Sequence, residues 1–465
     1  MSLPLRRPSI DSDYKKMPLV IRNRPWFVGM AVILSWALLL FISSTFFPEQ
    51  ILSLTESRAS EVHSRIHRGF DKTTRALDDT SDRIAEIVIN VSREECDQVI
   101  PVIDGLLDHI NPQIQLTFSC SDEYCVQAIQ DRVAQEREHF PWKTDIVLTN
   151  FRLTPWARDR RIARAGPMGQ ERFSLVPPAK DWYGIDRRNE IRLPYLLNDL
   201  GLAPEATPLP FLLDGGNLVT DSHYAFIGGN NIEVNRAVIP NQQDLKRMLK
   251  LYLGTPVVHV FARKKQVPWH HIDMYVPPLP GKRVLVASPV LAEQILTSTG
   301  ENHSIVKEKF LRLSFSRERS RLFDDVAGQF KKLNYDVTRI PAIPHYLDQW
   351  MMTYNNVLMD FRDQSSIVYL PTYGVHSLDQ HAQRIYEDLG FQVRTVNVSS
   401  LYRNGGTLRC FANVTKRVPR LPSSPNKIHD RTREINIHRP GSWVHQRMNP
   451  PPSKQTPAPI SGTVL

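Results

Sequence analysis

Cysteine is scarce in this chain, which has only four among its 465 residues. So few thiols exclude a small scaffold that is held together by a disulfide framework. Cys120 and Cys125 stand close together in the sequence, and two alternatives are open for them: a disulfide or two buried free thiols. Hydrophobic residues make up 41% of the chain and charged residues 23%. This composition excludes wholesale disorder and a collagen-like fibre, because such a chain can bury a core.

Net positive charge is missing from the middle of the chain, although the whole chain carries +10. Residues 1–25 hold six Lys and Arg and two Asp, which gives +4. Residues 416–465 hold nine Lys and Arg and two acidic residues, which gives +7. Residues 26–415 therefore carry −1. Binding of nucleic acid needs clustered positive charge, so this balance predicts that the central domain has no nucleic-acid partner.

One long hydrophobic run, from Trp26 to Phe47, contains no charged residue in 22 positions. At a rise of about 1.5 Å per residue, a helix of this length spans a bilayer core of roughly 30 Å. Basic residues precede the run and Glu49 follows it, so the positive-inside rule places residues 1–25 in the cytoplasm. We expect an uncleaved single-pass signal anchor, with the rest of the chain outside the cytoplasm (periplasmic, lumenal or extracellular). A cleaved signal peptide is the alternative, but the leading region is long and no clear A-x-A site follows.

The rest of the chain divides into three parts by composition. Residues 48–82 are polar and helix-compatible with sparse hydrophobic positions, which is typical of a stalk. Over residues 83–415, strand-like runs such as 84–91 alternate with amphipathic helical runs such as 94–110, which predicts an α/β domain. Residues 416–465 contain nine prolines, and we expect a disordered basic tail there.

Four short stretches of the α/β domain place polar or charged residues beside turns between hydrophobic strands. Each alone has a structural explanation: Asp159 can form a surface ion pair, Asp214 can begin a tight turn, and Cys410 can be a small core residue. His271 and Asp273 lie two residues apart, so on a strand they share one face and can form a buried pair. The stretches are TPWARDR (154–160), LLDGGNLV (212–219), HHIDMYV (270–276) and GGTLRCFANV (405–414).

In their order and wide spacing, these stretches together resemble the motifs of the bacterial-type peptidylarginine deiminase and agmatine deiminase family. The resemblance covers Arg83 to Val414. It implies the pentein fold, a five-bladed α/β propeller with the site on its central axis. The matching motifs are Trp156-Ala157-Arg158-Asp159, Asp214-Gly215-Gly216-Asn217, His271-Ile272-Asp273, Thr353-Tyr354-Asn355-Asn356 and Gly405-Gly406-Thr407-Leu408-Arg409-Cys410.

The resemblance also implies the chemistry of the site. Asp159 and Asp273 are expected to hold a planar guanidinium, because two carboxylates match its paired N–H donors. Cys410 attacks the guanidinium carbon as a thiolate, and His271 protonates the leaving ammonia and later deprotonates water. The covalent thiouronium then hydrolyses to a ureido product, and Asp214 is a candidate for orienting the imidazole. The residues expected to bind substrate are Trp156, Arg158, Asp159, Asp214, Asp273 and Asn356, and neither a metal nor a cofactor is expected.

The substrate is open between two guanidines. A domain outside the cytoplasm favours arginine in a peptide or protein, whereas agmatine is usually a cytosolic metabolite. Gly166-Pro167 stands farther from Asp159 than in agmatine-specific members, so the loop over the substrate differs. An amidinotransferase and a non-catalytic, membrane-tethered binding module are further alternatives. The basic residues of the variant loop could bind a peptide carboxylate or form a solvated surface, and they are Arg160, Arg161, Arg164 and Arg172.

Overall fold

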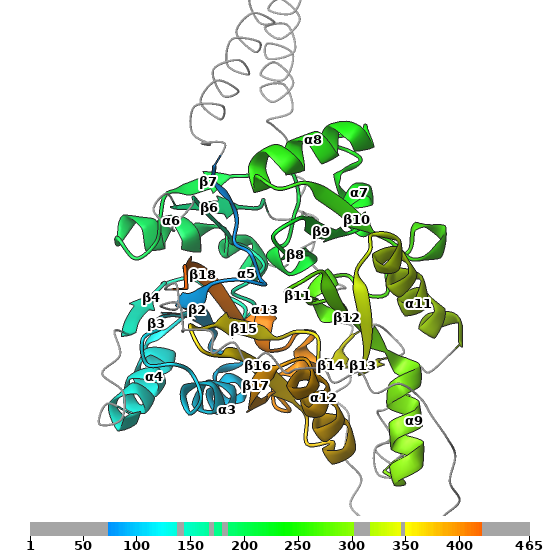
Figure 1. The fold of residues 1–465 in the computed structure, drawn as a ribbon. Coiled ribbons are helices and arrows are strands. Elements are labelled where there is room, and N and C mark those ends of the chain that lie inside the picture. Colours follow the sequence, from blue (N-terminus) through cyan, green and yellow to red (C-terminus); the bar gives the residue numbers. More distant parts are fainter. Residues whose placement is uncertain are drawn as a thin grey trace, which may run out of the picture. The chain divides into compact units, whose positions relative to one another are not determined.

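The computed structural model describes residues 73–136, 144–166, 172–178, 185–301, 317–345 and 349–420. In these residues the strands form five sheets of three or four strands each. Every sheet contains at least one parallel pair whose strands are joined through at least one helix, and at least one antiparallel pair. The structure is therefore an α/β fold of mixed sheets (Figure 1), and the predicted alternation of strands and helices is confirmed.

The described elements keep the order that the sequence predicts. The strands are β1 (Arg75–Ala76), β2 (Arg83–Val91), β3 (Gln115–Cys120), β4 (Thr144–Leu148), β5 (Ile162–Ala165), β6 (Arg172–Val176), β7 (Ala206–Pro208), β8 (Leu218–Thr220), β9 (Ala225–Gly228), β10 (Val257–Val260), β11 (Pro278–Leu279), β12 (Arg283–Ser288), β13 (Asp336–Pro344), β14 (Met351–Thr353), β15 (Leu358–Phe361), β16 (Ser366–Thr372), β17 (Phe391–Asn397) and β18 (Ala412–Val418). The α-helices are α3 (Cys96–Leu107), α4 (Glu123–Glu136), α5 (Ile185–Asn189), α6 (Arg192–Asp199), α7 (Asn230–Asn235), α8 (Gln242–Leu253), α9 (Pro289–Thr299), α11 (Arg317–Lys332), α12 (His376–Asp388) and α13 (Leu408–Phe411). The short 3-10 helices are η2 (Gly215–Asn217), η3 (Arg263–Lys265), η4 (Ile272–Met274) and η5 (Tyr402–Asn404).

One sheet joins the two ends of the domain. Its strand order is β18-β2-β3-β4, and β18 pairs antiparallel with β2. In the other four sheets the antiparallel strand β5, β8, β11 or β15 comes just before the parallel pair in the chain. Figure 1 shows β2 and β18, from opposite ends of the described chain, lying side by side. This pairing fixes α13, which directly precedes β18, against the start of the domain.

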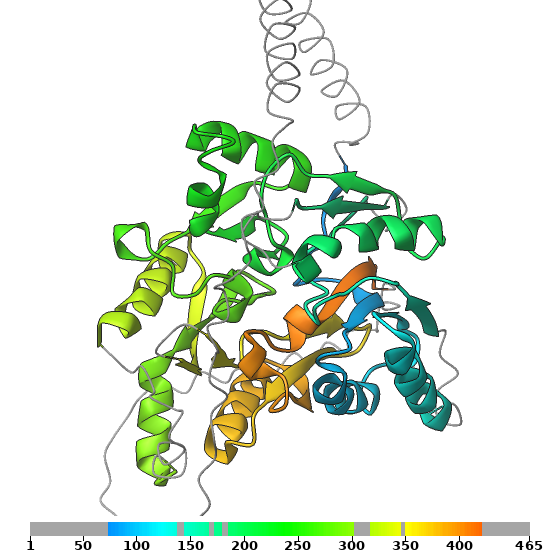
Figure 2. The same cartoon turned by 180° about the vertical axis from the view of Figure 1, so that it is seen from behind.

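The longer helices lie on the outer side of the sheets, as both views show (Figure 2). Helix α3 buries Val99, Val102 and Leu106 on the face that it packs against the core, which is the spacing of an amphipathic helix. Helix α8 begins where the side chain of Asn241 accepts a hydrogen bond from the backbone N–H of Gln243. These helices cover the hydrophobic strands and leave the strand ends and turns to form the candidate site.

Residues 73–82 pack onto the domain, although the sequence analysis assigns them to the stalk. Strand β1 pairs with β5, and the buried Thr74 hydroxyl accepts a hydrogen bond from Nε of Arg164 at 2.7 Å. Asp79 and Thr220 exchange hydrogen bonds through their backbones and through the Asp79 carboxylate. The sequence analysis did not assign this segment to the domain, because a strand of two residues has no hydrophobic periodicity.

The other flanking predictions lie mostly outside the described residues. These are the cytoplasmic segment 1–25, the anchor 26–47, the stalk up to residue 72 and the tail beyond Arg420. The first residues assigned to the tail, Lys416 to Val418, form the end of β18 instead. None of the helices in the described ranges has the length and hydrophobicity needed to cross a membrane.

All four cysteines of the chain are buried free thiols. Of the two alternatives for Cys120 and Cys125, the structure therefore has the pair of buried thiols. Burial raises the pKa of Cys120 to about 12 and also raises the pKa of Cys125. Neither thiol is poised to react.

A truncated chain tests whether residues 73–82 belong to the folded unit. We expect a chain that begins at residue 83 to lose at least about 3 kcal/mol in free energy of unfolding relative to one that begins at 73. Removing one partner of a buried ion pair costs about 3–5 kcal/mol, and the deletion removes Asp79 from Arg409. Urea unfolding followed by circular dichroism measures the difference, and equal unfolding midpoints would contradict the expectation.

Candidate active site

The predicted stretches meet at one place, although they lie far apart in the sequence. The carbonyl oxygen of Cys410, in the one-turn helix α13, accepts a hydrogen bond from the backbone N–H of Arg158 at 3.2 Å. The backbone N–H of Gly215 donates to the carbonyl oxygen of Asp159 at 3.0 Å. The short helices η2 and η4 also contact each other. The backbone itself therefore holds the four stretches together.

Two glycines in the motifs are required by close approach of neighbouring groups. A Cβ atom on Gly216 would lie 2.6 Å from Nδ1 of His271 and 3.0 Å from Oδ1 of Asp159. A Cβ atom on Gly406 would lie 2.5 Å from the indole ring of Trp156. No larger residue leaves this space, so the two glycines let the imidazole and the indole reach their positions.

His271 lies between two buried carboxylates. Its Nδ1 is 3.6 Å from Oδ1 of Asp159, and its Nε2 is 3.3 Å from Oδ2 of Asp214. Burial by itself would lower the pKa of His271, but the carboxylates of Asp159, Asp214 and Asp273 outweigh it, so the pKa is raised. The carboxylates therefore favour the cationic form of the imidazole, and Asp214 has the position expected for orienting it.

Asn356 fixes the helical turn that carries Cys410. Its Oδ1 accepts hydrogen bonds from the backbone N–H groups of Arg409 at 2.8 Å and Cys410 at 3.2 Å, and from the hydroxyl of Thr407 at 2.7 Å. Its Nδ2 lies 3.3 Å from Sγ of Cys410. The buried amide thus satisfies the first N–H groups of α13 and places the thiol at the same time.

The thiol of Cys410 is buried and close to negative charge. Its Sγ lies 3.9 Å from Oδ2 of Asp273. Burial raises the pKa of Cys410 well above its usual range, and the carboxylates of Asp273 and Asp159 raise it further. Without a cation in the site, the thiol is protonated at neutral pH.

An open pocket of about 350 Å³ leads from the surface to Cys410. Asp273 and Asn356 do not line this pocket and lie behind it, whereas Asp273 lines a second, much smaller cavity. In the described part of the chain, no three His, Cys, Asp or Glu side chains form a group that could hold a metal ion. The residues that line the open pocket are Thr154, Trp156, Asp159, Arg187, His270, His271, Gln349, Asn404, Gly405, Gly406 and Cys410.

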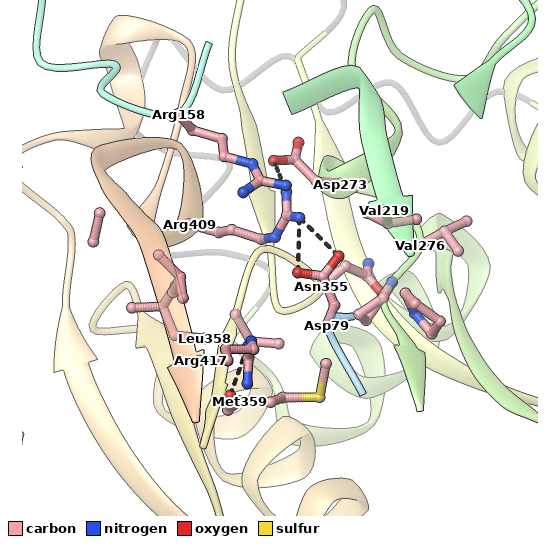
Figure 3. Close-up of a pocket in the computed structure, with 15 residues that line it drawn as sticks. Asp79, Arg158, Val219, Asp273, Val276, Asn355, Leu358, Met359, Arg409 and Arg417 are labelled. Atoms are coloured by element: carbon pink, nitrogen blue, oxygen red, sulfur yellow. Dashed lines mark hydrogen bonds and ion pairs between the residues drawn. The ribbon is translucent and has the colours of Figure 1, made fainter. Parts of the chain in front are cut away.

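Both carboxylates expected to hold a guanidinium already bind guanidinium groups of the chain. Nη2 of Arg187 lies 2.5 Å from Oδ2 of Asp159, and Nη1 of Arg409 lies 2.9 Å from Oδ2 of Asp273 (Figure 3). Oδ1 of Asp273 is buried and has no hydrogen-bond partner among the described residues. An unpartnered buried carboxylate oxygen is costly unless a ligand satisfies it. Oδ1 of Asp273 is therefore a buried acceptor that no described group satisfies.

The predicted arginines have other partners. Arg158 is buried and donates to the carbonyl oxygens of Gly215 and Leu218 and to Oδ1 of Asn413, so its side chain lies on the closed side of the site. The proposed basic loop is neither solvated nor aimed at a peptide carboxylate, and that expectation is wrong. Its side chains are held by partners within the domain: Arg160 by Asp214, Arg161 by Ser174, Arg164 by Thr74 and Arg172 by Glu86.

Sequence reasoning missed Arg187, Arg409 and Asp79. Arg187 lies in the five-residue helix α5, outside every motif. Arg409 is inside the last motif and directly precedes the nucleophile candidate, which was the one available signal. Asp79 lay in the segment assigned to the stalk. Nothing in the sequence distinguishes Asp79 from its acidic neighbours Asp78 and Asp82.

Comparison with known proteins identifies the family and the fold. The family model described as Porphyromonas-type peptidyl-arginine deiminase matches residues 90–419. The structure of C. jejuni agmatine deiminase is similar at 13% identity and a TM-score of 0.55, with 74% of this chain and 97% of that chain covered. A crystal structure provisionally described as a peptidyl-arginine deiminase is similar at 16% identity and a TM-score of 0.53, with 75% and 99% covered. At such identities the likeness shows a shared pentein-type α/β fold, and the search of curated proteins finds no match.

Asp214→Asn tests the charge on the imidazole. Removing this carboxylate should lower the pKa of His271, which an NMR titration of the labelled ring measures, and Asp244→Asn on the exposed face of α8 is the control. Because the folded-state pKa lies above the ordinary 6.5, protonation of His271 stabilises the fold fully below about pH 6.5. That contribution is lost as the pH rises through the raised pKa, and it should shrink in the variant. An unchanged titration would show that Asp214 does not act on the ring.

Proposed function

The chain belongs to the Porphyromonas-type peptidyl-arginine deiminase family, whose members are guanidino-modifying hydrolases, and we propose that it converts peptidyl-arginine to citrulline and ammonia. The observation that carries the proposal is the convergence of Cys410, His271 and Asp159 at one pocket, with the carboxylate of Asp273 3.9 Å from the thiol. The substrate guanidinium binds between Asp159 and the unpartnered Oδ1 of Asp273. Two carboxylates fix a planar cation with its central carbon in one position.

Binding of the cation activates the thiol. Burial and the nearby carboxylates raise the pKa of Cys410, and a bound guanidinium offsets those carboxylates. Cys410 then loses its proton to solvent through the open pocket, and the thiolate attacks the guanidinium carbon. The positive His271 donates its proton to the departing nitrogen, which leaves as ammonia. A thiouronium cation remains on the sulfur.

The second half of the reaction returns the site to its first state. Neutral His271 takes a proton from water, and the resulting hydroxide attacks the thiouronium carbon. The carbon–sulfur bond breaks as the carbonyl forms, and the hydroxyl proton returns to the sulfur. The product carries a neutral ureido group, which no longer matches two carboxylates and therefore leaves.

The arrangement of the molecule forms part of the same proposal. We propose that the five sheets are the blades of a propeller around the site, because each has the same parallel pair with an antiparallel neighbour and β18 closes the circle onto β2. We also propose that residues 26–47 anchor the chain in a membrane with the domain outside the cytoplasm. The charge-free run and the basic residues before it support this topology.

The direct test is an assay of the full-length protein beside its Cys410→Ala variant. Arginine peptides, free arginine and agmatine are each incubated with both proteins, and ureido product and ammonia are measured. We expect product from the unaltered protein alone, with peptides as the best substrates. A preference for agmatine would show that the substrate is agmatine rather than peptidyl-arginine. Dependence on an acceptor amine without ammonia would indicate an amidinotransferase, and no product from a folded protein would favour a binding module.

Arg187→Ala tests whether the internal arginine competes with the substrate. Arg187 binds Asp159 through the same chemical group as the substrate, and its side chain is 18% exposed at the pocket. Its removal should lower the KM for guanidine substrates by about threefold to tenfold, because the substrate no longer has to displace Arg187 from the carboxylate of Asp159. Arg188→Ala, on the exposed side of the same helix, is the matched control. A higher KM in Arg187→Ala would instead assign Arg187 to substrate contact.

A further inference from the structure

A second cavity lies behind the candidate site and is lined by charged side chains (Figure 3). Its volume of about 10 Å³ leaves roughly the space of one water molecule. Three arginines, Arg158, Arg409 and Arg417, face it together with Asp79 and Asp273. Oδ2 of Asp273 lies 3.9 Å from Sγ of Cys410 and 2.9 Å from Nη1 of Arg409, so this carboxylate joins the nucleophile to the charged cluster.

Arg409 joins the two carboxylates of the cluster. Its Nη1 lies 2.9 Å from Oδ2 of Asp273, and its Nη2 lies 3.1 and 3.0 Å from the two oxygens of Asp79. The side chains of Arg409 and Asp273 are 7% and 0% exposed. The dashed lines in Figure 3 show Arg409 lying between its two partners. A planar guanidinium can serve both carboxylates at once, which an ammonium on a single point cannot.

Asp79 is itself fixed in place. Its Oδ2 accepts a hydrogen bond from the backbone N–H of Thr220 at 2.9 Å, and its own N–H donates to the carbonyl oxygen of Thr220 at 3.1 Å. Burial acts to raise the pKa of Asp79, but the nearby arginines, first of all Arg409, outweigh it and lower the pKa. Asp79 therefore remains an anion beside Arg409.

The two ends of Arg409 have opposite consequences for the site. Its bond to Oδ2 prevents the Asp273 carboxylate from turning, so that Oδ1 alone is left without a partner. Its positive charge, however, also reduces the attraction of Asp273 for a second guanidinium. The carboxylate of Asp79, which binds Nη2 of Arg409, offsets that positive charge and leaves the bond between Arg409 and Asp273 in place.

We propose that Asp79 is a positioning residue for the guanidinium site, acting through Arg409 on Asp273. This inference rests on the proposed function, because it concerns how that site binds its cation. Asp79 precedes residue 90, where the family match begins, so the match assigns it no role. The segment before the family domain thus supplies part of the charge that lets Asp273 receive a cation.

Two probes of equal shape measure the site without a substrate assay. 2-Chloroacetamidine carries a planar cation and an alkylating carbon, whereas 2-chloroacetamide is its neutral counterpart. The full-length protein is treated with each, and the rate of alkylation of Cys410 is followed by peptide mass mapping. We expect the unaltered protein to react much faster with the cation. If it has no preference for the cation, the guanidinium site itself is absent and the proposed function fails.

Asp79→Asn is the decisive variant because it keeps the shape of the side chain and removes its charge. Its rate with the amidine should fall by about tenfold, while its rate with the amide stays within about twofold, since coupling within one ion-pair network is of that size. With a peptide substrate, KM should rise by a similar factor with a smaller change in kcat. A purely structural role would lower both alkylation rates together, or the fraction of folded protein. Either that result or an unchanged preference would overturn the proposal.

Asp78→Asn is the matched control. Asp78 is the adjacent carboxylate of the same segment, and its hydrogen bonds go to Thr80 rather than to Arg409. It should keep the full preference for the amidine. Arg409→Lys covers the case in which Asp79→Asn does not fold, because a lysine has one nitrogen in place of the two Nη groups that hold Asp273 and Asp79 separately, and it should lose the same preference. Retention of the preference in a folded Arg409→Lys protein would also overturn the proposal.

Discussion

The candidate site depends on keeping several carboxylates ionised where little water reaches them. Asp159, Asp214 and Asp273 are all buried, and isolated buried charges would cost far more than the fold can supply. Each carboxylate therefore has its own cationic neighbour: Arg187, Arg160 and Arg409 respectively. These arginines therefore stabilise the ionised form of the buried carboxylates, whatever further role they have in a reaction.

The balance is not equal at the two carboxylates proposed to bind substrate. Burial acts to raise the pKa of Asp159, but His271 and Arg187 outweigh it and lower the pKa. Burial raises the pKa of Asp273, which Arg409 and His271 only partly offset. The ionised form of Asp159 is thus already favoured by its neighbours. The ionised form of Asp273 is favoured less, so a bound cation stabilises it more. This asymmetry explains why the support behind Asp273 matters more to binding than a further partner for Asp159 would.

Local patterns predicted the elements of the domain well. The strand-like run at 84–91 became β2, which is buried continuously over its last five residues. The amphipathic run at 94–110 became α3, because its periodicity determines which face is buried. The resemblance to the deiminase family, carried by the order of the motifs, implied that Cys410, His271, Asp159 and Asn356 share one site. That prediction came from the family and not from local patterns.

The missed features all depend on contacts between distant parts of the chain. The pairing of β18 with β2 joins residues more than 300 positions apart, and no local pattern encodes it. Arg187 and Asp79 belong to the site only through their ion pairs, Arg187 with Asp159 and Asp79 with Arg409. Arg158 stands next to Asp159 in the motif, yet its side chain turns to the carbonyl oxygens on the closed side. Sequence spacing specifies which residues arrive at the site but not which way each side chain points.

In the proposed mechanism, charge also explains how a protonated thiol can serve as the nucleophile. A neutral ligand in the pocket would leave the carboxylates near Cys410 unopposed, so the thiol would keep its proton. A planar cation changes this locally, because it offsets Asp159 and Asp273 and brings its electrophilic carbon to the sulfur in the same step. In the proposed mechanism the thiolate therefore forms only when the cationic substrate is bound. Selectivity for guanidinium over a neutral amide then follows from the same buried carboxylates that raise the pKa of Cys410.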